Sequence, residues 1–312
     1  MQPRPVLSDM PDHIKQQIVD SLDTVTKRSI RRCSTEFKSF FNTSPLHYHQ
    51  LILHIRSLYI GIRITIDHLN PSNKLEIEYH SHPKGHLIQN DNENFEKLVE
   101  GGKDYLEAAA EHFWKIWKDP KVTVQNFYLS MASNSFPPDS FSVFLGHLNR
   151  SRGVSTLSAK TFNVYFGSDQ CSLHPVLSIL KPGHLKGIEV EGYPGDSRVL
   201  PMDQVGQLEV WQQARELCVQ RLSMHCPISE FQHFEVLRIR VNHLEIGMVR
   251  SLVETFVTRN HQLTDISYRT ADSQEILEFL KRFEVSEEAS DEYQLAPDVL
   301  AYFDSMFFLI RR

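Results

Sequence analysis

The stretch 236–241, Val-Leu-Arg-Ile-Arg-Val, decides the fold class of this chain together with residues 244–258 and 263–266, which follow it. Apolar and polar residues alternate in 236–241 and again in 263–266, which is the period-two pattern of a half-buried strand. Residues 244–258 form a longer, helix-like run between them. A strand, a helix and another strand in this order predict two parallel neighbours, with the helix on one side of the sheet.

The same alternation of strand-like and helix-like runs recurs from about residue 121 onward. The strand-like runs are 122–129, 162–166, 185–190, 216–219, 236–241 and 263–266, and the helix-like runs are 140–149, 173–180, 211–215 and 244–258. Strand centres separated by roughly 20–36 residues are typical of β/α solenoid repeats. We therefore predict an α/β chain (α+β overall) whose larger part is an irregular, leucine-rich-repeat-like β/α arc. A compact α/β sandwich with the same element order is the structural alternative.

The segment before this region also has a strand-like beginning. Residues 48–66 and 74–79 alternate at period two, which predicts two or three antiparallel strands. Residues 81–92 are polar and predict a loop. Residues 95–117 predict a helix that is broken at the glycine pair 101–102.

The first 45 residues predict a compact helical module. Pro11 suits the first turn of a helix because it has no N–H to leave unpaired. The apolar stripe of this helix is Met10, Ile14, Ile18 and Leu22, and that of a second helix is Ile30, Cys33 and Phe37. Two short amphipathic helices cannot bury both stripes on each other, so they need a third surface, which can belong to another protein.

Composition limits the class of protein. The 312 residues are 41% hydrophobic and carry a formal net charge of −6. No apolar run reaches the roughly 18 residues of a membrane span, and no apolar core of a secretory signal is present. We expect a cytoplasmic or nuclear location, or both, without secretion. The cysteines form no C-x-x-C motif and are expected to be buried free thiols; they are Cys33, Cys171, Cys218 and Cys226.

Residues 6–46 resemble an F-box. The family pattern is a Leu-Pro start, an Ile/Leu-rich helix, a Leu, a Val-Cys pair and an aromatic residue. These places are filled by Met10-Pro11, Ile14, Ile18 and Leu22, Ile30, Cys33-Ser34, and Phe37. The departures are Met10 for Leu and Cys33-Ser34 for Val-Cys.

Residues from about 110 to 260 resemble the FTH domain, the partner of F-boxes in a large nematode family, the F-box A type. Its "leucine-glutamate, tryptophan, alanine-basic" signature is matched by 207–217, Gln-Leu-Glu-Val-Trp-Gln-Gln-Ala-Arg-Glu-Leu. The stretches 157–162, 180–188 and 228–234 are similar to further parts of the domain. Val210 and Gln212 depart from it, because Gln and Lys are common at these two places.

This resemblance implies the substrate-recognition subunit of an SCF-type (Skp–cullin–F-box) E3 ubiquitin ligase. The F-box would bind a Skp-type adaptor, and through it a cullin–RING ligase, while the FTH domain would bind an unidentified protein substrate. No catalysis, cofactor, metal, direct nucleic-acid contact or membrane contact is expected of this chain. The adaptor-binding residues would be Leu7, Met10, Pro11, Ile14, Ile18, Leu22, Ile30, Cys33 and Phe37.

The substrate-contacting residues are predicted only from the outward positions of a period-two pattern. They are Gln125, Tyr128, Asn163, Tyr165, Glu189, Glu191, Arg238 and Arg240. The expected division of the chain is an F-box at 1–46, a β-hairpin region with connecting helices at 47–120, an FTH domain of β/α repeats at 121–282, and an acidic segment with an apolar cap at 283–312.

Other classes of function remain as alternatives. The first is a solenoid scaffold or adaptor for protein–protein interaction that never engages a ligase. The second is a DNA-binding helix-turn-helix, suggested by Lys27, Arg28, Arg31 and Arg32, but the acidic chain shows no wider basic footprint. An enzyme is the third. His80, His82 and His86 could ligate a metal, yet a His-rich polar loop is more often solvated.

Overall fold

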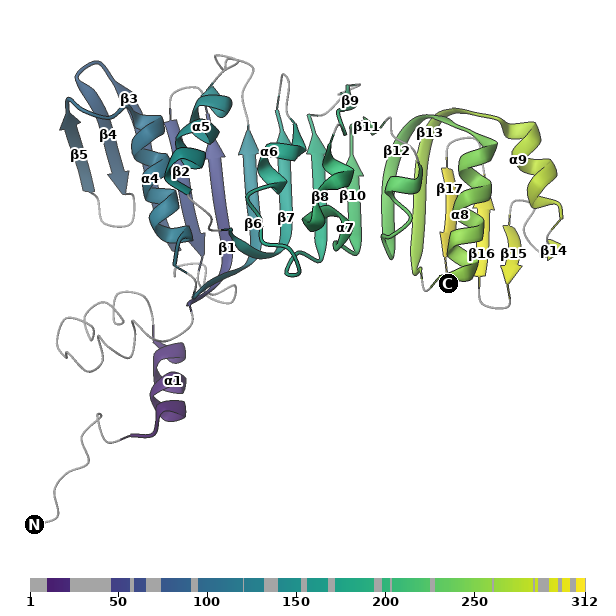
Figure 1. Cartoon of the computed structure of the whole chain (residues 1–312), viewed down its shortest axis with the longest axis horizontal. Helices are drawn as coiled ribbons and strands as arrows, with labels where there is room; N and C mark the ends of the chain where they lie inside the picture. The colour runs from purple at the N-terminus through teal and green to yellow at the C-terminus, as the bar shows by residue number, and fades with distance from the viewer. Residues whose placement is uncertain are drawn as a thin grey trace, which may run out of the picture.

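The computed structural model describes residues 10–22, 46–56, 59–65, 74–90, 95–119, 121–131, 140–152, 156–167, 172–193, 198–202, 204–224, 228–259, 261–282, 284–285, 292–296, 299–303 and 307–311. Its strands belong to one mixed sheet, which runs the length of the larger part of the molecule (Figure 1). The chain is therefore mixed α/β, as predicted.

The first part of the sheet is antiparallel. Its strands, in spatial order, are β5 (Phe95–Glu100), β4 (Gly85–Asn90), β3 (Lys74–His82), β2 (Tyr59–Thr65) and β1 (Leu46–Ile55). The alternation of apolar residues in 48–66 and 74–79 thus predicted β1, β2 and β3 correctly.

The central part of the sheet is parallel. Its strands follow β1 in spatial order as β6 (Val122–Met131), β7 (Ser158–Phe166), β8 (Gly187–Gly192), β10 (Glu216–Gln220), β12 (Val236–Leu244) and β13 (Leu263–Ala271). Two short strands, β9 (Val199–Leu200) and β11 (Ser223–Met224), pair with each other, and β11 also pairs with β12. Each main strand lies beside the preceding main strand of the chain, so the predicted parallel pairing is confirmed.

The C-terminal strands return antiparallel. Outward from β13 they are β17 (Phe307–Arg311), β16 (Val299–Phe303), β15 (Glu292–Ala296) and β14 (Glu284–Val285). Phe308 and Ile310 of β17 are fully buried, and their pairing covers the edge that β13 would otherwise leave open.

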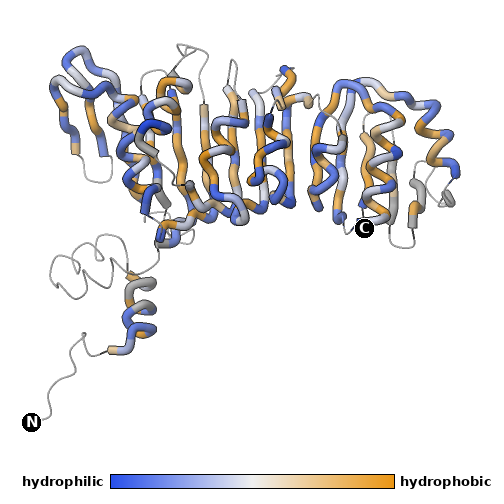
Figure 2. The backbone as a smooth tube through the Cα atoms, viewed as in Figure 1, coloured by the Kyte–Doolittle hydropathy of each residue, from blue (hydrophilic) through white to orange (hydrophobic). Residues whose placement is uncertain are grey.

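Helices cover one face of the sheet (Figure 1). They are α4 (Tyr105–Trp117), α5 (Ser140–Arg152), α6 (Leu173–Leu177), α7 (Glu209–Gln212), α8 (Ile246–Thr258) and α9 (Ser273–Leu280), with the 3-10 turns η3 (Val205–Gln207) and η4 (Ile228–Glu230). Phe113 of α4 packs 6.0 Å from Phe127 of β6, which lies 5.5 Å from Phe162 of β7, measured between ring centroids. These contacts identify the side of each strand that faces the helices, and Figure 2 shows the resulting alternation of apolar and polar residues.

Two predictions for residues 81–100 are wrong. Residues 85–90 form β4 instead of a loop, and 95–100 form β5 instead of the start of a helix. The backbone N–H and C=O groups of each strand form hydrogen bonds with the other strand of the hairpin. The sequence pattern of one segment does not show such pairing with another segment. The helix begins only at Tyr105, where the Asp104 carboxylate accepts a hydrogen bond from the N–H of Glu107 at 2.8 Å. Helix α9 was not predicted.

Trp211, the centre of the quoted 207–217 segment, is a core residue. Its side chain is fully buried, and its ring lies 5.0 Å from that of Phe234 in an edge-to-face arrangement. The indole N–H donates to the carbonyl of Glu230 at 3.3 Å. The tryptophan therefore joins α7, η4 and the segment before β12. Across the described ranges, no helix is long and apolar enough to cross a membrane.

Candidate functional site

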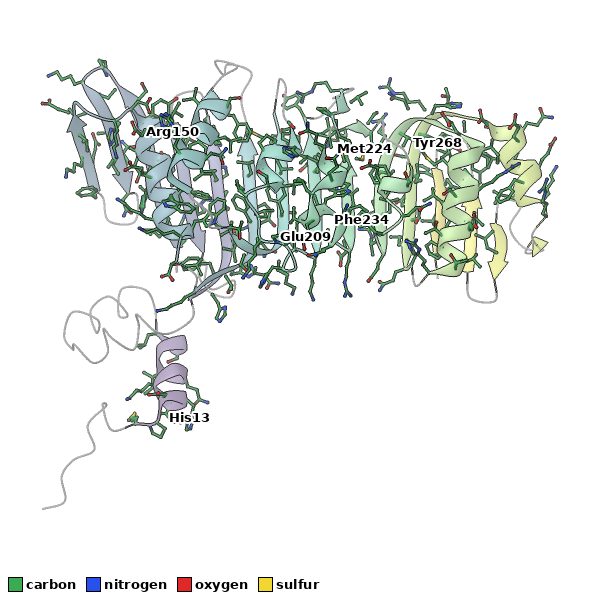
Figure 3. The ribbon with its side chains drawn as sticks, in the orientation of Figure 1. His13, Arg150, Glu209, Met224, Phe234 and Tyr268 are labelled. Carbon is green, nitrogen blue, oxygen red and sulfur yellow. The ribbon has the colours of Figure 1, made fainter. Side chains whose placement is uncertain are left out.

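The first candidate surface is one face of α1 (Asp12–Ser21). The helix begins just after Pro11, whose carbonyl accepts from the N–H groups of Ile14 at 3.0 Å and Lys15 at 3.1 Å. The stripe residues Met10, Ile14, Ile18 and Leu22 are half-buried, and Pro11 is exposed. On the other side of the helix, His13 is exposed (Figure 3).

The stripe of α1 is not part of the main core. The buried cluster of the described residues begins at Leu51 and includes no side chain from α1. A half-buried apolar stripe that joins no core fits a docking face. The other predicted adaptor contacts, Leu7, Ile30, Cys33 and Phe37, lie outside the described residues, so their packing is not part of this observation.

The second candidate surface is the face of the parallel strands opposite the helices, which we call the open face. One row of the open face follows the strand register from Ile52 on β1 to Asp265 on β13. The residues aligned in this row are Ile52, Tyr128, Asn163, Glu189, Cys218, Arg238 and Asp265. The next row aligns His54, Ser130, Tyr165, Glu191 and Gln220, and on β12 and β13 it continues with Arg240 and Ser267.

The open face brings together all of the predicted substrate-contacting residues except Gln125. Tyr128, Asn163, Glu189 and Arg238 share the first row, and the other three share the second. Each of these side chains is half-buried or exposed. Their role in binding stays a prediction. Their convergence across four strands is a property of the register, since adjacent strands lie about 4.8 Å apart.

Charges of opposite sign lie next to one another on the open face. Glu191 forms an ion pair with Arg221 at 2.5 Å, and Gln220 donates to Glu189 at 3.3 Å. Burial raises the pKa of Asp265, while the Arg238 guanidinium in the same row opposes that rise. The surface therefore offers both an acidic part on β8 and a basic part on β12 to a ligand.

Cys218 corrects the expectation that the cysteines are buried. It is a free thiol, half-buried at the centre of the first row, because it points outward between the buried Leu217 and Val219. Burial, as the largest effect, raises the pKa of the Cys218 thiol. The thiol therefore stays protonated at neutral pH and is a poor nucleophile. The other three cysteines lie outside the described residues.

Gln125 lies away from the open-face rows. The register of β6 and β7 passes from Val124–Ala159 directly to Asn126–Thr161, so Gln125 and Lys160 both fall at an irregularity. Here Gln125 lines a cavity of about 170 Å³ together with His47, Lys160 and His184. Period two fails at Gln125 because one extra residue in a strand inverts the side on which the next side chains point.

Several residues at these surfaces were missed by the sequence reasoning. Cys218 and Asp265 occupy outward positions of the same period-two pattern and could have been found by it. Lys160 and His184 could not, because only the strand register brings them beside His47.

In the part of the chain that the structure describes, no three His, Cys, Asp or Glu side chains are placed to hold a metal ion. His80 Nε2 lies 3.0 Å from a carboxylate oxygen of Glu78, and His86 Nδ1 lies 3.0 Å from the carbonyl of Lys103. The two imidazoles therefore have separate partners.

Two models of known protein families match this chain. A model of the F-box domain matches residues 7–49, which include α1. A model of the FTH domain matches residues 140–283, from α5 to beyond α9. No curated protein and no solved structure matches the chain. With α1 in the first match and the strands from β7 to β13 in the second, the chain is an F-box protein with an FTH domain.

Proposed function

We propose that this protein is the substrate-recognition subunit of an SCF-type E3 ubiquitin ligase. The observation that supports it most directly is the apolar stripe of α1, which lies within the F-box match and joins no described core cluster. The stripe would dock on a Skp-type adaptor, which links the chain to a cullin–RING ligase. An interface of about 800 Å² per partner is within reach of helices of this size.

The receptor would do no covalent chemistry itself. It would hold a target lysine near a conjugating enzyme that other subunits carry, so its contribution to the rate is proximity. The protonated thiol of Cys218 is consistent with a surface that binds a target and does not attack it.

We further infer that the parallel strands form a leucine-rich-repeat-like arc and that the open face is the target-binding surface. Two features support this. Successive parallel strands are neighbours, and the helices among the described residues of this region lie on one side of the sheet (Figure 1). Within the described part of the chain, no helix covers the polar rows from Tyr128 to Arg240, and such faces are the usual binding surfaces of solenoids.

The experiment that tests the ligase proposal is co-expression with a Skp-type adaptor, followed by size-exclusion chromatography. The test variant is Ile14→Asp/Ile18→Asp, which charges the stripe. The matched control is His13→Asp/Gln17→Asp, two exposed residues with the same spacing on the same helix. We expect a 1:1 complex with the wild type and the control, and none with the test variant.

Circular dichroism distinguishes the outcomes. If the test variant stays folded and loses the adaptor, the docking proposal stands. If the wild type forms no complex and the test variant unfolds, α1 is a structural element. The chain is then an interaction scaffold that does not engage a ligase.

A further inference from the structure

A small cavity lies at the amino-terminal ends of the parallel strands, and its lining shares no residue with α1 or with the two rows of the open face. It has a volume of about 170 Å³. Besides Tyr48, six polar side chains line it: His47 of β1, Thr123 and Gln125 of β6, Ser158 and Lys160 of β7, and His184 of the segment before β8. Segments that are far apart in the sequence thus place six polar side chains around one space.

The lining is rich in hydrogen-bond donors. Lys160 carries a positive charge, Gln125 has an amide N–H₂, and the two hydroxyls and two imidazoles can each donate or accept. His47 Nδ1 already lies 2.5 Å from the Thr123 hydroxyl oxygen, so these two groups are held together at the cavity wall. No Asp or Glu is among the described lining residues.

Two carbonyl oxygens of the strands that line the cavity accept hydrogen bonds from protein side chains. The carbonyl oxygens of His49 and Gln125 accept from Asn126 and Thr161, each at 3.3 Å. Burial, and after it the Asp119 carboxylate, raises the pKa of the lining residue Tyr48, and Asp119 Oδ1 accepts the N–H of Lys121 at 3.0 Å. The positive charge among the lining side chains is that of Lys160.

We propose that this cavity binds a phosphate group. A tetrahedral phosphate ester presents three free oxygens with a charge close to −2, so it accepts from donors on more sides than a planar carboxylate does. A phosphate group with its five heavy atoms fits within a space of about 170 Å³.

Two sources supply this chemistry, a phosphorylated side chain of a partner protein and free inorganic phosphate. If the phosphate belongs to a partner protein, target capture would depend on phosphorylation of the target, and this source rests on the proposed receptor function. The phosphate site itself does not rest on it.

The test is isothermal titration calorimetry on the full chain at constant ionic strength. The probes are inorganic phosphate and a short phosphoserine peptide with its unphosphorylated form. The test variant is Lys160→Gln/His184→Gln, and the control is Lys181→Gln/Lys186→Gln, which removes two exposed lysines outside the lining. A second variant, Gln125→Glu, keeps the shape of an exposed side chain and adds a negative charge to the cavity.

We expect the test variant and Gln125→Glu to weaken phosphate binding by about tenfold or more, and the control by no more than about twofold. Tighter binding of the phosphopeptide than of inorganic phosphate assigns the source to a partner, and equal affinities assign it to the free ion. The proposal is overturned by equal losses in test and control variants, which would indicate diffuse charge, or by no binding of either probe at about 10 mM.

Adaptor binding of the same variants separates this inference from the ligase proposal. The phosphate variants should retain the adaptor complex, because their substitutions lie outside the F-box match. A variant of α1 should bind phosphate normally.

Discussion

The imidazole Nε2 of His233 lies 2.9 Å from the carbonyl oxygen of Trp211, and the two rings are 6.3 Å apart. This contact requires the proton on Nε2, so the neutral imidazole already serves as the donor. Burial, the largest effect, lowers the pKa of His233, and Arg259 lowers it further, while the Trp211 carbonyl opposes the change. The hydrogen bond therefore ties His233 to the backbone of the buried tryptophan, while burial disfavours the charged form of the imidazole.

Acid should destabilise the protein through this group. The unfolded chain takes up the proton near pH 6.5, whereas the folded imidazole stays neutral to a lower pH. The contribution of His233 to the free energy of unfolding is thus fully present above about pH 6.5, and it is lost as the pH falls toward the lower pKa of the folded state. His54 and His112, whose pKa values are also lowered, mainly by burial, act in the same direction. Urea unfolding at about pH 7.5 and about pH 5.5 measures how the free energy of unfolding depends on pH. His233→Gln keeps a hydrogen-bond donor near the position of Nε2 and should reduce this pH dependence. An unchanged pH dependence in the variant would contradict this account.

Two glycines should respond oppositely to alanine. Gly85 has a φ of +151°, and a Cβ there would lie 2.1 Å from the carbonyl oxygen of Val99, so Gly85→Ala should cost about 2 kcal/mol or more. Gly146 lies in α5, and a Cβ there meets nothing within 4 Å. Gly146→Ala should therefore stabilise the protein by up to about 1 kcal/mol. Chemical denaturation of both variants checks the prediction, which fails if the two changes have the same sign.

The strand irregularity at Gln125 should depend on Thr161. Its hydroxyl lies 2.6 Å from the Asn126 side-chain oxygen and 3.3 Å from the Gln125 carbonyl oxygen. Thr161→Val keeps the shape and removes the hydroxyl, and we expect a loss of about 1–3 kcal/mol in the free energy of unfolding. Thr258→Val is the control, because its exposed hydroxyl bonds only carbonyls of its own helix, and it should change stability by no more than about 0.5 kcal/mol. Equal losses would show that the irregularity does not need this bond.

The open face should tolerate charge reversal in the free protein. Glu189→Lys/Arg238→Glu keeps the net charge, and both side chains are exposed, but the new carboxylate at position 238 lies opposite Asp265, so we expect the protein to stay folded with a loss of about 1 kcal/mol in the free energy of unfolding. Proteins that co-purify with the wild type as targets should be lost from this variant. The control, Glu278→Lys/Lys281→Glu at the end of α9, should retain them. Loss with the α9 variant alone would place the target on the helical side.

The amino-acid sequence by itself determined the parallel core and its outward residues. The alternation in 236–241 predicts which side chains of β12 are buried, and Arg238 and Arg240 do face away from the core formed by Leu237 and Ile239. The four-residue spacing of Ile14 and Ile18 likewise predicts α1. These features depend on periods of two or four residues, which a helix or strand imposes locally.

Only the tertiary structure decided the features that involve pairing. Residues 95–100 become a strand because β4 lies beside them, and Gln125 leaves the open face because β6 and β7 carry a common irregularity. Cys218 lies between Glu189 and Arg238, and His184 lies beside His47, through the register of strands that are distant in the chain. A register is set by contacts between segments, and the period of one segment carries no information about its partner.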